Sequence, residues 1–438
     1  MTTDFTLQPT ADALEARIRA NRLLSLPVAW ADEMVFPHYG GLSIYNLAQS
    51  VAHVLGVDLP NPVPLDEAVW GGDSPVGQVD RVVMFLSDGL GYRWLRRFMD
   101  DDPALRAAVA DLSEGRGPLP LTSVTPSTTA AALTTLWTGH TPIAHGIIGL
   151  TMFLREFSMQ FYSLTFAPPG RRFAENTFAQ WGLNPDTFIP VEGLAMALQA
   201  AGVPTHLLLD YRLMESGLSR LLHRGVSQRH FHLSFADFWL RLGEALRATT
   251  GQRCVVSVYW PAVDALAHAY GANTPYLRAE VRQQFENMTR LLADSGIRDG
   301  RTLLLFLADH GHHDVPRLVD FRRHPQAGPV RAALRCGMSG EGRLPYLNLL
   351  PDGRDEALET LSCDFADTLT WVDAHAAAYA GLFGPEAPYA ESLHRLGDAV
   401  IVPRLGCMVI DSSPEPVVSA HGGLTDWEML VPFIWKRL

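Results

Sequence analysis

The chain has 438 residues, with 35 Lys and Arg against 47 Asp and Glu, and therefore a formal net charge of −12. This acidic balance argues against binding to duplex nucleic acid, because such binding depends on basic side chains that neutralise phosphates. Hydrophobic residues make up 47% of the chain and charged residues 19%, a composition that predicts a large packed core and excludes intrinsic disorder.

The spacing of the cysteines and the hydropathy of the chain indicate in which cellular compartment the protein is expected. The sequence has four widely spaced cysteines and no CxxC pair: Cys254, Cys336, Cys363 and Cys407. This pattern predicts free thiols and excludes both a disulfide framework and a cysteine zinc site. The N-terminal residues lack the apolar segment of a signal peptide, and no run approaches the ~18 apolar residues that a membrane-spanning helix needs. We therefore expect a cytoplasmic protein that does not contact a membrane.

The first strong strand signal is the apolar run Arg81–Ser87, which ends at Asp88-Gly89 and is followed by a helical stretch over Tyr92–Met99. Apolar runs that end at polar residues recur along the chain, at His206–Leu209, Cys254–Trp260 and Thr302–Leu307. Helical patterns lie between these runs, for example Gly193–Ala201 and Phe235–Ala248. Strands that alternate with helices predict an α/β fold with a doubly wound, mostly parallel sheet flanked by helices.

Two stretches interrupt this alternation, residues 155–235 and residues 320–400. A cap built from one or both is compatible with the pattern, and in the second stretch we expect a strand-like piece at Leu344–Leu350 and a helix near Ala366–Leu382. We predict that residues 321–399 form an inserted cap or lid subdomain. The catalytic domain would then comprise residues 1–320 and 400–438.

The residues that can carry chemistry follow the predicted strands, at the sheet edge where doubly wound folds bind their ligands. Asp88 is the first, although Asp-Gly is also an ordinary turn pair. Thr128 or Thr129 then opens an Ala- and Leu-rich helix. A threonine there is often only a cap, but a hydroxyl at a helix N-terminus also lies beside free amides that bind phosphate oxygens.

Further candidates lie later in the chain. Asp264 and His268 are four residues apart, so both project from one face of a helix, as metal ligands or as an ordinary surface pair. Asp309 and His310 directly follow the run Thr302–Leu307, and His421 precedes Gly-Gly in a late loop. We interpret His312 and His313 as loop residues, with substrate contact as the second reading, and His140 and His145 as structural.

Together these positions provide three aspartates and three histidines at strand ends. Mixed carboxylate and imidazole ligands suit Zn²⁺ or Mn²⁺, whereas Ca²⁺ prefers oxygen ligands alone. Six ligands are too many for one tetrahedral ion and divide into two sites. Paired metal ions about 3.5–4 Å apart are the usual device for in-line phosphoryl displacement.

The order Asp, Thr, Asp-x-x-x-His, Asp-His-Gly, His-Gly resembles the alkaline phosphatase superfamily, and within it the type I phosphodiesterase/nucleotide pyrophosphatase branch. The resemblance implies an alkaline-phosphatase-like fold and two divalent metal ions, Zn²⁺ or alternatively Mn²⁺. It also implies the ligand sets: Asp88, Asp309 and His310 for one ion, and Asp264, His268 and His421 for the other.

The resemblance further implies that Thr129 is the nucleophile, because the family nucleophile lies ten residues before the Gly of a Thr-Gly pair, here Gly139. The family's oxyanion-stabilising Asn corresponds to Leu150 in this chain. The phosphate oxygen would then be held by backbone amides at Thr129 or by Arg155.

These observations predict a two-metal-dependent phosphodiesterase that acts on small-molecule phosphate esters through a phosphothreonine intermediate. A phosphomonoesterase or phosphonate hydrolase of the same superfamily is the alternative. A sulfatase or a mutase would favour Ser or Cys in place of Thr129. A non-catalytic metal-binding scaffold is the remaining possibility from a different class.

Overall fold

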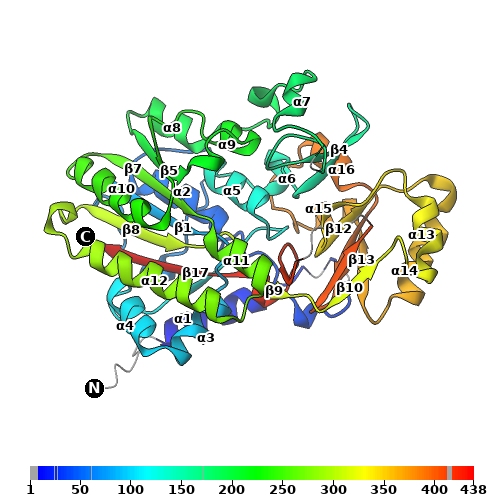
Figure 1. Cartoon of the computed structure of the whole chain (residues 1–438), viewed down its shortest axis with the longest axis horizontal. Helices are drawn as coiled ribbons and strands as arrows, with labels where there is room; N and C mark the ends of the chain where they lie inside the picture. The colour runs from blue at the N-terminus through cyan, green and yellow to red at the C-terminus, as the bar shows by residue number, and fades with distance from the viewer. Residues whose placement is uncertain (1–7, 24, 27, 61, 171, 412–416) are drawn as a thin grey trace.

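The largest sheet of the computed structural model has seven strands; the structure describes residues 8–438 except 24, 27, 61, 171 and 412–416 (Figure 1). Its strands lie in the order β2 (Leu119–Thr122), β17 (Leu430–Arg437), β8 (Thr302–Leu307), β1 (Arg81–Ser87), β7 (Cys254–Trp260), β5 (Thr205–Asp210) and β6 (Gln228–His232). The five strands from β8 to β6 are parallel, and β17 runs antiparallel to both of its neighbours.

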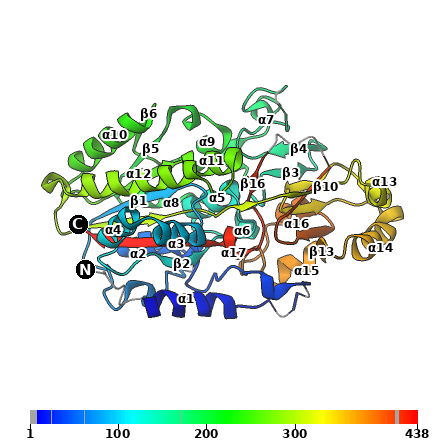
Figure 2. The same ribbon diagram turned by 60° about the horizontal axis from the view of Figure 1, so that its bottom comes forward.

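Two groups of helices enclose this sheet, as the turned view shows (Figure 2). The first group comprises α3 (Tyr92–Asp101), α4 (Pro103–Leu112), α10 (Phe235–Ala248), α11 (Ala262–Tyr270) and α12 (Pro275–Leu292). The second comprises α2 (Ile44–Val54), α5 (Thr129–Thr138), α8 (Leu194–Ala200) and α9 (Gly217–Leu222). Every residue of β1 and β8 is buried, as expected for strands covered on both faces. The predicted mostly parallel α/β fold is confirmed.

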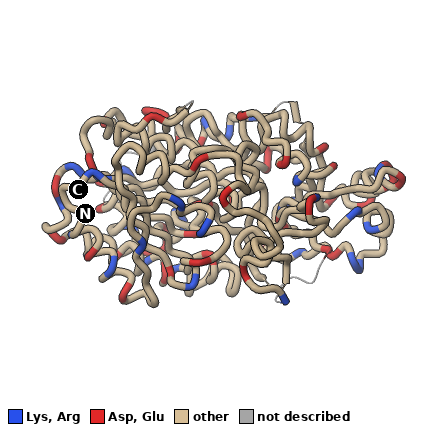
Figure 3. The backbone as a smooth tube through the Cα atoms, turned by 90° about the horizontal axis from the view of Figure 1, so that it is seen from above, with Lys and Arg blue, Asp and Glu red and all other residues tan. Residues whose placement is uncertain are grey.

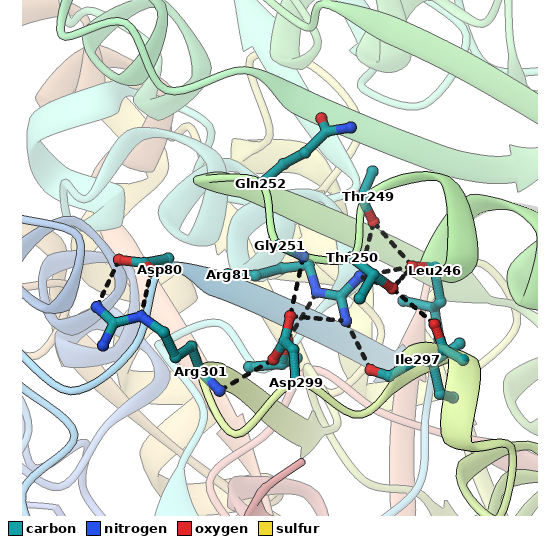
Figure 4. Close-up of polar contacts among 12 residues, drawn as sticks. Asp80, Arg81, Leu246, Thr249, Thr250, Gly251, Gln252, Ile297, Asp299 and Arg301 are labelled. Carbon is teal, nitrogen blue, oxygen red and sulfur yellow. Dashed lines mark hydrogen bonds and ion pairs between the residues drawn. The ribbon is translucent and has the colours of Figure 1, made fainter.

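The central strand β1 begins at a buried arginine that ties together the edge of the sheet opposite the candidate site (Figure 4). Arg81 is 1% exposed. Its guanidinium donates to the Thr302 hydroxyl at 2.8 Å and to the Ile297 carbonyl at 2.7 Å, and Asp299 lies 3.7 Å away. The Thr249 hydroxyl is a further partner at 3.0 Å. These bonds compensate the desolvation of a buried cation and join β1 to β8 and to the end of α10.

A second, antiparallel sheet lies beyond the carboxyl ends of the parallel strands (Figure 1). Its order is β13 (Leu369–Asp373), β14 (Ala399–Pro403), β12 (Leu344–Leu347), β11 (Ser339–Glu341), β3 (Thr151–Leu154) and β4 (Met159–Tyr162). Residues 151–162 therefore pair with strands from residues 339–403. The helices beside it are α13 (Gly328–Ala333), α14 (Arg354–Asp364), α15 (Ala374–Tyr379) and α16 (Ala390–Leu396).

One secondary-structure expectation in this region is wrong in part. A helix is expected near Ala366–Leu382, but Leu369–Asp373 forms β13 and the helix is confined to Ala374–Tyr379. The sequence Leu-Thr-Trp-Val is rich in residues that favour strands, and pairing with β14 outweighs the helical pattern of the alanines that follow.

The remaining elements connect the two sheets or lie at their margins. The short strands β9 (His313–Asp314) and β16 (Ser419–Ala420) pair with each other, as do β10 (Arg317–Asp320) and β15 (Cys407–Ile410). The other helices are α1 (Gln8–Ala20), α6 (Pro142–His145), α7 (Thr177–Gln180) and α17 (Asp426–Met429). Acidic and basic residues are interspersed along the whole molecule (Figure 3). Among the described residues, no helix is both long and apolar enough to span a membrane.

Candidate active site

Asp88, Asp309 and His310 meet where the central strands end. Asp88 follows β1, and its amide donates to the carbonyl of Trp260 at the end of β7 (3.0 Å). Asp309 and His310 follow β8. The Nε2 atom of His310 lies 3.4 Å from Asp88 Oδ1 and 3.5 Å from Asp309 Oδ2. All three side chains are buried and offer ligand atoms within 4.8 Å of one another, so this first group could hold a metal ion.

Close backbone packing holds the Asp-His-Gly turn in place. A Cβ on Gly311 would lie 2.1 Å from the carbonyl oxygen of Trp427 and 2.7 Å from Cα of Gly91. Only glycine allows these backbone segments to approach each other so closely. The glycine after Asp309-His310 is therefore explained by packing, and it directs both preceding side chains into the site.

A second group of possible metal ligands adjoins the first. Asp264 Oδ1 lies 3.4 Å from His268 Nε2, 3.6 Å from His421 Nε2 and 2.6 Å from His312 Nε2. The helical spacing of Asp264 and His268 in α11 brings both to one face, as expected from the sequence. The rings of His310 and His421 stack with centroids 3.8 Å apart, so the two groups form one continuous site.

The outer ring nitrogens of these histidines are all occupied. Nδ1 of His268 lies 2.8 Å from the Ser419 carbonyl, and Nδ1 of His421 lies 3.1 Å from the Ser127 carbonyl. The Nδ1 atom of His310 lies 3.1 Å from the carbonyl of Gly311. An Nδ1–H bonded to a carbonyl leaves Nε2 unprotonated and turned toward the carboxylates, which is the usual arrangement for metal-ligating histidines.

Thr129 lies at the first group of ligands. Its Oγ1 is 3.0 Å from His310 Nε2, and it is the first residue of α5. The preceding Thr128 is the N-cap residue, but its hydroxyl makes no capping bond; it lies beside the carboxyl group of Glu341, whose pKa it lowers against the larger effect of burial. The first amides of a helix have no partner within the helix, so the Thr129 hydroxyl stands beside groups that can bind an anionic oxygen.

The buried carboxylates of the first group fit a cation. Asp88 Oδ1 and Asp309 Oδ2 are buried atoms with no hydrogen-bond partner in the described structure. Burial, together with the charges of Asp309 and Asp264, raises the pKa of Asp88 well above its usual value. Such a cluster of buried acids is unfavourable by itself, and a divalent ion would satisfy the free oxygens and cancel the repulsion.

The carboxylate of Asp264 has a different environment. Burial alone would raise its pKa, but the hydrogen bond from His312 and the neighbouring imidazoles outweigh this effect and lower the pKa. Burial lowers the pKa of His312 to about 4, against the opposing effect of Asp264. At neutral pH, Asp264 is therefore ionised and His312 is an uncharged hydrogen-bond donor.

The interpretation of His312 as a loop residue missed its role in the site. It lies outside regular structure but is buried, with Nε2 on Asp264 and Nδ1 3.1 Å from the Ser419 hydroxyl. The pattern Asp-His-Gly-His could have indicated this, because alternate residues of an extended segment point to one side. Tyr259, for which the sequence favours core packing over a place in the substrate pocket, also reaches the site; its hydroxyl donates to Asp88 Oδ2.

Arg155 is not brought to these groups. It lies in the turn between β3 and β4, its side chain is 54% exposed, and it forms a bidentate ion pair with Glu391. His145 is buried, and its ring nitrogens contact the Thr135 hydroxyl and the Ile147 amide, in agreement with a structural role. His140 lies 2.7 Å from Glu386.

Comparison with solved structures shows similar folds at low sequence identity. Human ectonucleotide pyrophosphatase/phosphodiesterase 5 is 15% identical, with a TM-score of 0.57 over 82% of this chain and 87% of that one. The inactive murine enzyme, in complex with AMP, is 14% identical, with a TM-score of 0.55 over 81% of this chain and 87% of that one. Phosphonoacetate hydrolase from Sinorhizobium meliloti 1021, in complex with phosphonoformate, is 17% identical, with a TM-score of 0.58 over 82% and 90% of the two chains.

No curated protein sequence matches the chain significantly. A family model does match, that of the type I phosphodiesterases/nucleotide pyrophosphatases, over residues 82–424. This range contains Thr129 and both groups of possible metal ligands. The chain therefore belongs to the type I phosphodiesterase/nucleotide pyrophosphatase family, within the alkaline phosphatase superfamily.

Proposed function

We propose that the protein is a two-metal-dependent phosphodiesterase that cleaves small-molecule phosphate esters through a phosphothreonine intermediate on Thr129. The observation that carries the proposal is the position of the Thr129 hydroxyl, 3.0 Å from His310 Nε2 at the start of α5. A hydroxyl placed among buried acids, imidazoles and helix amides is suited to nucleophilic attack on a phosphate ester.

The ligands are proposed as two sets. Asp88, Asp309 and His310 would hold one ion, and Asp264, His268 and His421 the other, with Zn²⁺ as the expected metal and Mn²⁺ as the alternative. When bound, the ions would neutralise the carboxylates, stabilise charge that develops on oxygen and lower the pKa of hydroxyl groups beside them. His312 would hold the Asp264 carboxylate in position through the hydrogen bond between them.

The chain's own residues then have distinct tasks. The Thr129 hydroxyl loses its proton to solvent and its oxygen attacks phosphorus. A P–O bond to threonine forms while the bond to the leaving group breaks on the opposite side, and the leaving oxygen takes up a proton from solvent or departs as the anion. The first amides of α5 donate to a non-bridging phosphate oxygen. They take the role of the family's oxyanion-stabilising Asn, whose position is occupied by Leu150 in this chain. Water then attacks the phosphothreonine, releases the phosphate monoester and restores the threonine hydroxyl.

The proposal is tested by measuring how fast the protein releases p-nitrophenol from a set of p-nitrophenyl esters. Bis(p-nitrophenyl) phosphate, p-nitrophenyl phosphate, p-nitrophenyl phenylphosphonate and p-nitrophenyl sulfate are compared with Zn²⁺ and with Mn²⁺. We expect the diester to be hydrolysed more than about tenfold faster than the monoester. Preference for the monoester or the phosphonate would establish the alternative activity within the superfamily. No turnover of any ester by the metal-loaded protein would indicate a metal-binding scaffold.

Thr129→Ala tests the nucleophile, with Thr128→Ala as its matched control. We expect the first variant to lose activity by a factor of about 10³ or more while still binding metal, because no covalent intermediate can form. The second variant should retain most of the activity. Full activity of Thr129→Ala would refute the assignment, and loss confined to Thr128→Ala would move it by one residue.

A further inference from the structure

A cavity of about 750 Å³ opens between the candidate active site and the second sheet. Its wall includes His268 and His421 from the second group of ligands, and Ser339 and Glu341 from strand β11. A substituent of an ester bound at Thr129 would therefore extend into a space whose far wall belongs to the second sheet. The side chains of that wall are in a position to select the substrate.

Glu341 is the most unusual of these side chains. It is 8% exposed, and its Oε1 accepts a hydrogen bond from the amide of Leu150 at 2.8 Å. It packs against the loop of His421, since a Cβ on Gly422 would lie 2.7 Å from Cβ of Glu341. No Lys, Arg or His of the described residues lies within ion-pair distance of its carboxylate, which is costly for a buried acid.

The cavity also contains a buried polar group without a partner among the described residues, the hydroxyl of Ser339. Ser339 lies two residues before Glu341 and so on the same side of β11; its hydroxyl is buried and has no hydrogen-bond partner. Asp411 and Glu175 also line the cavity, and none of its described lining residues is Lys or Arg. Burial raises the pKa of Glu341 to about 8, as expected for an acid that lacks a cation beside it. A cation bound next to this group would lower its pKa again and favour the ionised carboxylate.

We propose that this cavity binds a primary ammonium group on the substrate, with Glu341 as the counter-charge and Ser339 as a second acceptor. The ammonium group provides three donors and one positive charge, which is the complement of a buried carboxylate beside an unpaired hydroxyl. Phe173 lines the same cavity, and an aromatic ring is a suitable neighbour for a cation. Among the described residues that line the cavity, Glu175, Glu341 and Asp411 are acidic and none is Lys or Arg, so substituents that carry a carboxylate or a further phosphate are disfavoured. This inference rests on the proposed phosphodiesterase function.

Two nearly isosteric diesters test the inference, p-nitrophenyl 2-aminoethyl phosphate and p-nitrophenyl propyl phosphate, with the 2-carboxyethyl ester as the anionic member. For the metal-loaded full chain we expect kcat/KM to be at least about tenfold higher for the aminoethyl ester than for the propyl ester, and lowest for the carboxyethyl ester. In Glu341→Gln the ratio of aminoethyl to propyl should fall to about one. Glu33→Gln, which removes a surface acid paired with Arg404, should keep the wild-type ratio.

Binding of 2-aminoethyl phosphate and of propyl phosphate, measured by calorimetry on the same proteins, separates this inference from the proposed function. If no ester is hydrolysed but the aminoethyl compound binds more tightly to the wild type than to Glu341→Gln, the proposed function fails and the ammonium site stands. If diesters are hydrolysed without an ammonium preference, the function stands and this inference is overturned. An equal decrease in kcat/KM for the aminoethyl and propyl esters in Glu341→Gln would also overturn it, because the carboxylate would then affect both substrates equally.

Discussion

The buried ion pair between Arg343 and Glu428 joins the second sheet to the loop that carries His421, and its removal should strongly destabilise the protein. Both side chains are fully buried, and the guanidinium contacts the two carboxylate oxygens at 2.9 and 2.8 Å. Glu428 also accepts the amide of Gly423 at 3.0 Å and the hydroxyl of Thr425 at 2.6 Å. One carboxylate therefore organises the turn that follows His421.

The magnitude follows from the charge that is left behind. Arg343→Met leaves Glu428 ionised and buried without a cation, which typically costs about 3–5 kcal/mol. The pKa of Glu428 reflects the same pairing. Burial would raise it, but the charge and hydrogen bonds of Arg343 outweigh burial and lower it from 4.5 to about 2.

The sign of the pH dependence is also determined. The pKa of Glu428 is lower in the folded state than in the unfolded state, so its contribution is complete above pH 4.5 and is lost as the pH falls toward 2. Urea unfolding at pH 7 should show that Arg343→Met is less stable than the wild type by about 3–5 kcal/mol. The variant should also lose less stability than the wild type between pH 5 and pH 3.

Arg404→Met provides the matched control. Arg404 forms a bidentate pair with Glu33, but both side chains are about two-fifths exposed, so its loss should cost at most about 1 kcal/mol. Arg343→Met combined with Glu428→Met removes the buried charge entirely and should recover part of the stability. If Arg343→Met is no less stable than Arg404→Met, burial does not determine the strength of these pairs and the reasoning is refuted.

Two further predictions concern histidines. His312→Leu removes the hydrogen bond to Asp264 and should lower metal affinity by about 10–100-fold, measured by competition with a chelator. His313→Leu, at the neighbouring position, is the control and should change the affinity little. Equal metal affinities of the two variants would contradict the role of His312. Burial lowers the pKa of His223, which packs against Trp137, from 6.5 to about 3. The unfolded state therefore binds protons first, and stability falls by roughly 3 kcal/mol between pH 6.5 and pH 4. His223→Phe should show a flatter dependence in urea unfolding, and an unchanged slope would exclude this histidine as its source.

Local sequence patterns were sufficient for much of the sheet. The bounds of Arg81–Ser87, Cys254–Trp260 and Thr302–Leu307 agree with the structure, because buried parallel strands are short apolar runs that end where polar turn residues begin. The same runs predict that Asp88 and Asp309 lie at one edge of the sheet, since the carboxyl ends of parallel strands lie at the same edge. The predicted cap of residues 321–399 and the cytoplasmic location remain predictions.

The α/β class, the family and the order of six candidate ligands could be predicted from the sequence, because they depend on residue type and spacing along the chain. Which groups meet across long separations became evident from the three-dimensional structure. It placed His312 on Asp264, paired Arg155 with Glu391 away from the ligand groups, and brought Glu341 against the loop of His421. The physical reason is that such contacts arise from the register of strands and the burial of side chains, which neighbouring residues in the sequence do not encode.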